Sequence, residues 1–332
     1  MEKLLVKIAV GYTKIGCDNI VEAFSKGVVD SGDSILEVKT RDDIWKIEQA
    51  DAMVQVAESG RSEILEYYCG SDAVDDFHFI KTYMGLKQIE LKKPRLIIDS
   101  GVLKDSRLLP DEDRYFSVGL NGIKGHAKYF NTDSPSDRWK KRGLRTKQWR
   151  TEGDHILIIG QSKKGAGLLH VGSKALDERE KYWNTPSDYY EDLPRRIRKF
   201  APNRKIVFRG HMTGASIAPS YTLENMETFE TSVENHVPIS EHLKNAWCAI
   251  TRTSNGAIDA LLEGVPVVTE DRVCLAHSVA ENSIKKIDSI KSPPMSSYVQ
   301  WLYDMAYVEW SLDEMRKGLP WQHFRKHICK PT

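Results

Sequence analysis

Long hydrophobic runs and paired cysteines are absent from this sequence. No apolar stretch approaches the roughly 18 residues that a membrane-spanning helix requires. Met1–Val10 carries charges and has neither the apolar core nor the small-residue cleavage site of a secretory signal. We therefore expect a soluble protein without a membrane span, located in the cytoplasm, which is the host cytoplasm if the chain is viral.

The cysteine pattern argues against two further classes of protein. The five cysteines are odd in number and none is close to another, so neither a disulfide framework nor a zinc site is expected. A convincing Asp-x-Asp metal site is missing as well, and so is the Gly-Lys-Ser/Thr ending of a P-loop. The cysteines are predicted to be free thiols in a reducing compartment.

What is present indicates an α/β protein. The 332 residues, of which 40% are hydrophobic and 29% charged, are enough for two domains with a core each. Strands that alternate with helices predict parallel sheets with crossover connections. The predicted strands are Lys7–Tyr12, Ser34–Val38, Ala52–Val56, Arg95–Asp99, Phe116–Gly119, His155–Ile159, Lys205–Phe208, Ala246–Thr251 and Val265–Val268. The predicted helices are Asn19–Val29, Ile44–Ile47, Glu63–Tyr68, Tyr189–Phe200, Asn255–Glu263 and packing helices within Tyr298–Arg316, while Asp72–Tyr83 is ambiguous.

The most informative stretch is Ala249–Thr269. It predicts a strand end, a small polar turn, an apolar helix, a glycine stop and a second buried strand. Ser254 can cap the helix, Gly256 lets a ligand approach the backbone, and the amides of the turn can form an anion site. Asp259 can accept hydrogen bonds from ribose hydroxyls. The alternative is an ordinary capped helix with a solvated acidic face.

Other polar residues follow predicted strands and can face the same ligand. Arg209 could bind a phosphate bidentately, and His211 could donate to a phosphate or a sugar hydroxyl. The loop with Gln161, Ser162 and Lys163 could contact phosphate, and Glu270 could touch a sugar. Structural or surface roles remain open for all of these residues.

Two residues are candidates for a general base, and one tract is a candidate for binding an acceptor. Asp99, at the end of a strand, or His126, in a polar loop, could deprotonate a hydroxyl. The tract 138–150 has seven cations and no acid. It can seat a nucleic-acid backbone or another acceptor, or be a solvated loop. Its candidate binding residues are Arg138, Lys140, Lys141, Arg142, Trp149 and Arg150. A second tract, 195–209, also has seven cations and no acid.

The stretch Thr253–Val268 resembles the sugar-nucleotide motif of GT-B glycosyltransferases. Those enzymes show a small-residue turn, an acid followed by alanine, and a Gly-x-Pro-Val segment. Arg209–His211 is similar to their Arg-x-His element, and the resemblance covers roughly Val207–Asp271. In overall look the chain is also similar to bacteriophage-type proteins.

The resemblance implies an α/β fold with two Rossmann-like domains facing a cleft. Residues 1–150 would bind the acceptor, residues 151–297 would bind the nucleotide-sugar, and helices in 298–332 would cross back to the first domain. Thr253, Ser254, Asn255 and Gly256 would take the pyrophosphate and Asp259 the ribose, with Arg209 and His211 beside the phosphates. The co-substrate would be a nucleotide-sugar, with UDP-sugar favoured, and no tightly bound cofactor or metal is expected.

One departure leaves the stereochemistry open. Retaining members carry a pair of glutamates, and the matching positions here hold Thr251 and Asp259. An inverting reaction would use a base such as Asp99 or His126. The expected function is transfer of a sugar to a hydroxyl, on a saccharide or on a hydroxymethylated base in DNA. A nucleotide-sugar epimerase and a non-catalytic nucleic-acid-binding protein remain alternatives, and the oligomeric state is unknown.

Overall fold

The protein divides into two compact units, which we call unit 1 and unit 2. In this computed structural model the described residues are 5–11, 17–56, 80, 83–85, 87, 90–103, 110–161, 186–211, 216–229, 231–232 and 237–328. Unit 1 comprises Met1–Ser134 and Asp304–Thr332, and unit 2 comprises Pro135–Tyr303. The sequence places domain boundaries after residues 150 and 297. The predicted helix 63–68 and most of the ambiguous stretch 72–83 lie outside the described residues.

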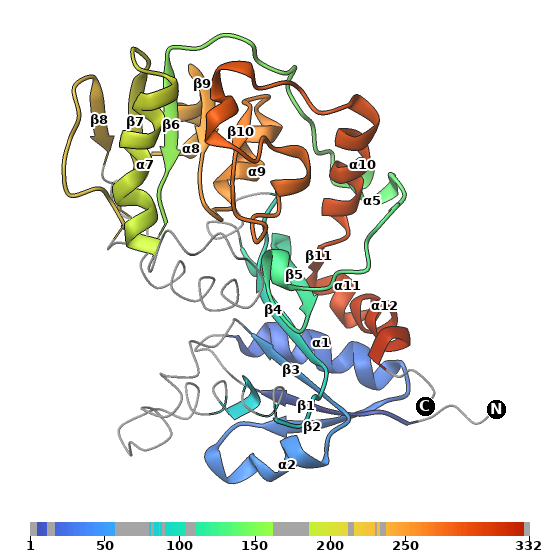
Figure 1. The fold of residues 1–332 in the computed structure, drawn as a ribbon. Helices are drawn as coiled ribbons and strands as arrows, with labels where there is room; N and C mark the ends of the chain where they lie inside the picture. Colours follow the sequence, from blue (N-terminus) through green and yellow to red (C-terminus); the bar gives the residue numbers. More distant parts are fainter. Residues whose placement is uncertain are drawn as a thin grey trace. The chain divides into compact units, whose positions relative to one another are not determined.

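Unit 1 contains a six-stranded sheet in the order β11-β5-β4-β3-β1-β2 (Figure 1). Its strands are β1 (Lys7–Gly11), β2 (Ser34–Val38), β3 (Ala52–Val56), β4 (Arg95–Ser100), β5 (Tyr115–Leu120) and β11 (Glu309–Ser311). The first four are parallel, as predicted. The sheet is not parallel throughout, because β5 and β11 run antiparallel to their neighbours. An apolar strand pattern is the same in either direction, so the sequence signals the strand and not its sense.

Helices cover both faces of this sheet. From Ile8 to Val10, successive side chains of β1 point to opposite faces and are apolar, so both faces have to be covered. Ile8 and Val10 point into a core formed with α1 (Asp18–Asp30), α11 (Leu312–Arg316) and α12 (Leu319–Ile328). Ala9, between them, faces a second core with Ile47 of α2 (Trp45–Gln49). Both layers are buried, so the sheet is the central layer of an α/β sandwich.

The C-terminal segment completes unit 1. The expectation that Tyr298–Arg316 forms only packing helices is wrong, because β11 separates α10 (Met295–Ala306) from α11. This three-residue strand is too short to show a periodic pattern. Asp33, before β2, anchors α12: its carboxylate accepts hydrogen bonds from Trp321 Nε1 at 2.8 Å and Arg325 Nε at 2.7 Å.

Unit 2 contains a wholly parallel five-stranded sheet in the order β10-β9-β6-β7-β8. Its strands are β6 (His155–Ile159), β7 (Lys205–Arg209), β8 (Met226–Phe229), β9 (Ala246–Ile250) and β10 (Val267–Val268). Its helices are α5 (Asp137–Lys141), α7 (Pro186–Phe200), α8 (Ile239–Leu243), α9 (Gly256–Leu262) and residues 295–303 of α10. The predicted α/β class with two Rossmann-like sheets is therefore confirmed. No sequence pattern predicted β8, an edge strand whose last three residues are exposed.

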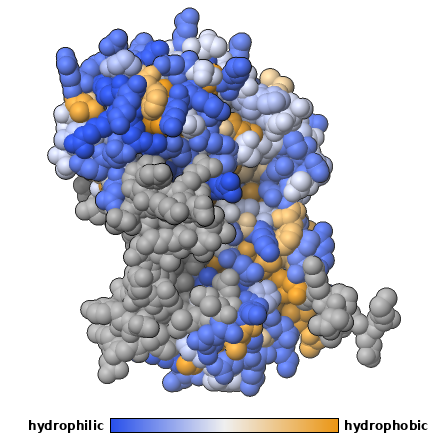
Figure 2. Space-filling view, in the orientation of Figure 1, coloured by the Kyte–Doolittle hydropathy of each residue, from blue (hydrophilic) through white to orange (hydrophobic). Residues whose placement is uncertain are grey.

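Short 3-10 helices span Arg41–Asp43, Asp111–Asp113, Lys124–His126, His277–Val279 and Ile284–Ser289. Cys17, Cys248 and Cys274 are buried free thiols, and burial raises the pKa of Cys248. Among the helices in the described ranges, none has the length and apolar content that crossing a bilayer requires. The face of unit 2 seen in Figure 2 carries mainly hydrophilic residues.

The strand order of unit 2 creates a topological switch point. From β6 the chain builds outward through β7 and β8 on one side, and then places β9 and β10 on the other. The loops that leave the carboxyl ends of β6 and β9 therefore diverge. In open parallel sheets this divergence leaves the crevice in which ligands bind.

Candidate functional site

Polar side chains from adjacent strands meet at the switch point of unit 2. Gln161 follows β6 and Thr253 follows β9, and both are buried. Gln161 Nε2 donates to Thr253 Oγ1 at 2.6 Å, and Thr253 N donates to Gln161 Oε1 at 3.2 Å. These reciprocal bonds fix the ends of two strands against each other, as a preorganised binding surface requires.

Tyr190 of α7 lies beneath this contact, and the sequence analysis did not identify it as a site residue. Its hydroxyl donates to Ile159 O at 3.1 Å and to Gln161 Oε1 at 2.9 Å, and lies 3.3 Å from Thr251 Oγ1. Burial is the main cause that raises the pKa of Tyr190 to about 12, so the hydroxyl stays protonated at neutral pH. From the sequence alone, Tyr190 was predicted only to lie in an amphipathic helix.

The turn before α9 satisfies most of its own amides. Gly256 N donates to Ser254 Oγ at 3.2 Å, and Ala257 N donates to Ser254 O at 3.2 Å. Ser254 N donates to Thr251 Oγ1 at 3.4 Å. Ser254 thus bonds the start of the helix, although the N-cap residue itself is Asn255. Of the amides at 253–258, only that of Asn255 has no hydrogen bond within the described part of the chain.

Arg209 ends β7, which neighbours β6, and His211 follows it. Arg209 is buried, and its Nη2 donates to Val237 O at 2.8 Å. His211 is half-buried, and Ser216 Oγ accepts a hydrogen bond from its backbone amide. A buried guanidinium at a carboxyl strand end supplies the positive charge that a phosphate needs.

The acidic candidates differ in their surroundings. Asp259 is half-buried on α9. Both carboxylate oxygens of Glu270 accept hydrogen bonds from Arg196 Nη2, at 2.8 and 2.7 Å, so this acid already has a cationic partner. A further pair that the sequence analysis did not identify joins Arg252 Nε to Asp271 Oδ2 at 3.0 Å. Arg252 lies directly after β9, in a stretch where only the small turn residues had indicated a binding site in the sequence.

Two of the predicted donor-site residues, Ser162 and Lys163, lie outside the described residues. The remaining donor candidates all lie at the carboxyl ends of β6, β7, β9 and β10 or at the start of α9. No group of three or more His, Cys, Asp or Glu side chains that could hold a metal ion occurs among the described residues.

The two candidate bases lie toward opposite edges of the unit 1 sheet. Asp99 lies near the carboxyl end of β4, opposite Ser117. His126 follows the carboxyl end of β5, and that end pairs with Leu96 at the start of β4. Since β4 and β5 are antiparallel, only Asp99 lies at the edge where the parallel strands end, the usual position of ligands in such sheets.

A buried acid supports the loop that follows Asp99. Glu309 of β11 is fully buried, and its Oε1 accepts hydrogen bonds from the amides of Val102 and Leu103, the latter at 2.8 Å. This carboxylate comes from a segment more than 200 residues away in sequence. Nothing in the local sequence around Asp99 indicates this contact, so it was not predicted.

The basic tracts are partly used by the protein itself. Arg138 is buried, Lys147 pairs with Glu263, and Arg150 Nη1 donates to two carbonyl groups. Lys140, Lys141 and Arg145 are exposed, and Arg142 and Trp149 are half-buried. In the second tract Arg195 lies over the Tyr221 ring, Arg196 binds Glu270, Arg198 binds Asn225 O, and Arg204 binds Gly153 O. Much of the positive charge in the second tract therefore stabilises the fold.

Comparison with solved structures finds similar chains at low sequence identity. The fold is similar to Thermosulfurimonas dismutans KpsC, beta Kdo 2,4 transferase, at 11% identity over 90% of this chain and 89% of that chain, with a TM-score of 0.49. It is also similar to Thermosulfurimonas dismutans KpsC, beta Kdo 2,7 transferase, at 13% identity over 95% of this chain and 99% of that chain, with a TM-score of 0.47. A third similar structure is UDP-GlcNAc 2-epimerase of Methanocaldococcus jannaschii, at 10% identity over 86% of this chain and 91% of that chain, with a TM-score of 0.30. No protein-family model and no curated protein matches the chain.

Proposed function

We propose that this protein is a glycosyltransferase that binds the diphosphate of a nucleotide-sugar at the switch point of unit 2. The observation that supports this most is the meeting of Gln161 and Thr253 between β6 and β9, with Arg209 ending the next strand. A rigid polar floor with a buried cation beside it suits a charged leaving group that must be held in one place. A UDP-sugar is the favoured donor.

The residues divide into binding and chemistry roles in this proposal. Arg209, His211 and the amide of Asn255 hold the phosphates, while Asp259 receives the ribose hydroxyls. Asp99, at the carboxyl edge of the unit 1 sheet, is the candidate base that removes the proton of the acceptor hydroxyl. Residues 1–150 bind the acceptor and residues 151–297 bind the donor.

A nucleoside diphosphate is expected to stabilise the folded protein. At one hundred times its Kd, a ligand stabilises by about 2.7 kcal/mol, which raises the Tm by several degrees. A thermal-shift screen of UDP, GDP, TDP, CDP, ADP and their sugars measures this. The donor-site proposal fails if none of them raises the Tm.

Two substitutions at one position test the phosphate contact. Asn255→Pro removes the amide that has no internal partner, and the φ of −64° at Asn255 suits proline. Asn255→Ala keeps the amide and is the matched control. We expect the proline variant to bind the diphosphate at least about tenfold more weakly, since a lost hydrogen bond to a charged group costs about 1.5–3 kcal/mol. Equal affinity of both variants would remove this contact from the proposal.

The acceptor is a hydroxyl on a saccharide or on a hydroxymethylated base in DNA. Incubation of protein and donor with each acceptor, followed by mass analysis, separates the two. Conversion of the donor without any acceptor would instead identify a nucleotide-sugar epimerase. DNA binding that persists without any donor binding would identify a nucleic-acid-binding protein.

DNA binding, if it serves the acceptor role, is expected to depend only moderately on salt. Lys140, Lys141 and Arg145 are exposed, and their side chains have no hydrogen bond or ion pair among the described residues. Three phosphate contacts predict a slope of about −2.7 in a plot of log K against log salt concentration. Replacing all three by Gln should flatten this slope, whereas the matched triple Lys199→Gln, Lys244→Gln and Lys286→Gln should not. An unchanged slope would place DNA on another surface.

A further inference from the structure

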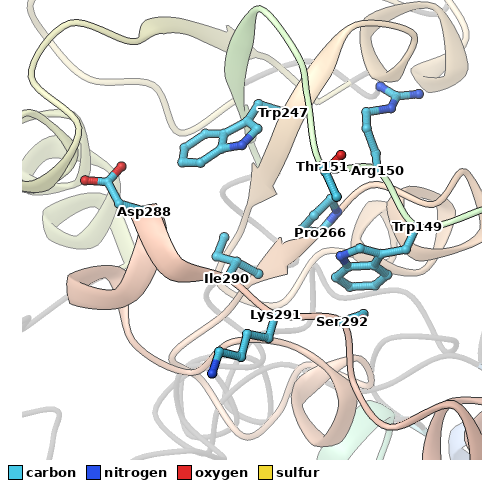
Figure 3. Close-up of a pocket in the computed structure, with 9 residues that line it drawn as sticks. All are labelled: Trp149, Arg150, Thr151, Trp247, Pro266, Asp288, Ile290, Lys291 and Ser292. Carbon is cyan, nitrogen blue, oxygen red and sulfur yellow. The ribbon is translucent and has the colours of Figure 1, made fainter.

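Unit 2 contains a pocket of about 510 Å³ that lies away from the switch point (Figure 3). Thr151 precedes β6, Trp247 is the second residue of β9, and Pro266 precedes β10, so the pocket lies at the amino edge of the sheet. The donor candidates lie at the carboxyl edge. Along β9 the rise of a strand separates Trp247 from Thr251 by roughly 13 Å. The pocket is therefore a separate site of a size that suits a small ligand.

The walls of the pocket are held in place by contacts outside it. Arg150 Nη1 donates to Leu243 O at 2.6 Å and to Ala246 O at 2.9 Å, and the Arg150 guanidinium points away from the cavity (Figure 3). These bonds hold the backbone on which Trp149 and Thr151 lie. The Trp149 ring also meets the ring of Tyr298 edge-on, with centroids 6.4 Å apart. A ligand would enter a cavity that is already formed, which lowers the cost of binding.

The second aromatic wall is braced in the same way. The guanidinium of Arg204 lies 4.1 Å from the centroid of the Trp247 ring. A Cβ at Gly153 would lie 2.4 Å from Trp247 N, so the chain before β6 packs directly on the start of β9. Trp247 and Trp149 consequently lie on two sides of the pocket, with Ile290 and Pro266 between them (Figure 3).

The polar groups at the rim are available for a ligand. Asp288 and Lys291 are exposed, and their side chains have no hydrogen bond or ion pair to any other described residue. The hydroxyls of Thr151 and Ser292 complete the rim. The pocket thus combines flat aromatic walls with a carboxylate, an ammonium group and hydroxyls. Sugars present the matching surface, because their rings have apolar C–H faces and a periphery of hydroxyls.

We propose that this pocket binds a saccharide, as a second sugar site separate from the donor site. A pyranose ring would lie against the indoles, with its hydroxyls bonded to Asp288 and Lys291. A nucleic-acid strand fits less well, because its phosphates would meet the Asp288 carboxylate and the Arg150 guanidinium is already bonded to carbonyl groups. Saccharide binding here does not depend on donor binding, since neither wall belongs to the donor site, although Trp149 is also among the candidate acceptor-binding residues.

The test uses the full chain and a panel of disaccharides: maltose, cellobiose, chitobiose, lactose and sucrose. Binding at millimolar concentration is followed by NMR of the indole N–H signals, with those of Trp149 and Trp247 assigned from single substitutions. We expect at least one disaccharide to shift both signals. Trp149→Ala should weaken its binding about tenfold or more, as the loss of a central aromatic contact does. Trp45→Ala, which removes an exposed tryptophan of unit 1, is the matched control and should leave binding unchanged.

A second variant protects the test against misfolding. Thr151→Trp enlarges the side chain at an exposed wall position, so the Tm should stay close to that of the unmodified chain. This variant should abolish binding by filling the cavity. The proposal is overturned if no disaccharide shifts the two indole signals, or if binding survives both Trp149→Ala and Thr151→Trp. A shift of these signals by single-stranded DNA but by no saccharide would overturn the assigned ligand class.

Discussion

Gly27→Ala is expected to destabilise unit 1 by about 3 kcal/mol or more. A Cβ at this position would lie 2.0 Å from Met315 O and 2.6 Å from Gly318 N. Both atoms belong to backbone, and Gly318 has a φ of +72° that other residues rarely adopt, so neither neighbour can move at low cost. In an exposed helix the same change would stabilise by roughly 1 kcal/mol, so the expected sign is the opposite of what helix propensity predicts.

Urea unfolding with hydrogen exchange of β1 and β3 peptides measures this effect in unit 1 itself. Glu22→Ala is the matched control, because Glu22 lies on the exposed face of the same helix. The control should change the free energy of unfolding by less than about 0.5 kcal/mol. If Gly27→Ala exchanged no faster than the control, the close packing of α1 on the α11–α12 turn would be refuted.

Asp33→Asn is expected to cost about 3–5 kcal/mol at neutral pH. The Asp33 side chain is fully buried and accepts hydrogen bonds from Val6 N, Trp321 Nε1 and Arg325 Nε. An asparagine would turn an amide group toward these donors and leave the Arg325 charge without its partner. Asp30→Asn is the matched control. It affects only an exposed pair with Lys26 and should cost less than about 1 kcal/mol.

The pH dependence of this difference has a defined sign. Burial raises the pKa of Asp33, but hydrogen bonds from Arg325, Val6 and Trp321 outweigh it and hold the pKa below its ordinary value of 3.8. The stabilisation is therefore complete above pH 4 and is lost as the pH falls through the folded-state pKa. The gap in unfolding free energy between the unmodified chain and Asp33→Asn should shrink below pH 4. A gap that widens on acidification would contradict this account.

The strands with strong apolar runs could be predicted from the sequence, whereas the strands with which they pair in the sheet could not. Arg95–Ser100 and His155–Ile159 are bounded by turn signals, and each was predicted within one residue. Glu309–Ser311 gives no local signal, because a three-residue strand is defined by its pairing with β5. Asp33 likewise looks like a turn residue in the sequence. Its role depends on Trp321 and Arg325, which lie almost 300 residues away.

The candidate site shows the same division. The positions of Gln161, Arg209 and Thr253 followed from strand ends, because the carboxyl ends of parallel strands meet at one edge of a sheet. The hydrogen bonds that Tyr190 makes to Ile159 and Gln161 could not be predicted from the sequence, since a tyrosine in an amphipathic helix has the pattern of a core residue. The sequence also suggested an open set of amides at the turn. The Thr251 and Ser254 side chains accept hydrogen bonds from two of them, the amides of Ser254 and Gly256, a detail that depends on rotamers and not on spacing.

The discontinuity of unit 1 has a consequence for how the protein is made. Trp321 and Phe324 cover the same face of its sheet as α1, yet they are among the last described residues to leave a ribosome. Unit 2 is continuous and can fold while it emerges, since domains generally fold as units during synthesis. In unit 1, by contrast, the part of this face that Trp321 and Phe324 cover stays exposed until translation has passed residue 324, so its core is completed only after unit 2 has been synthesised.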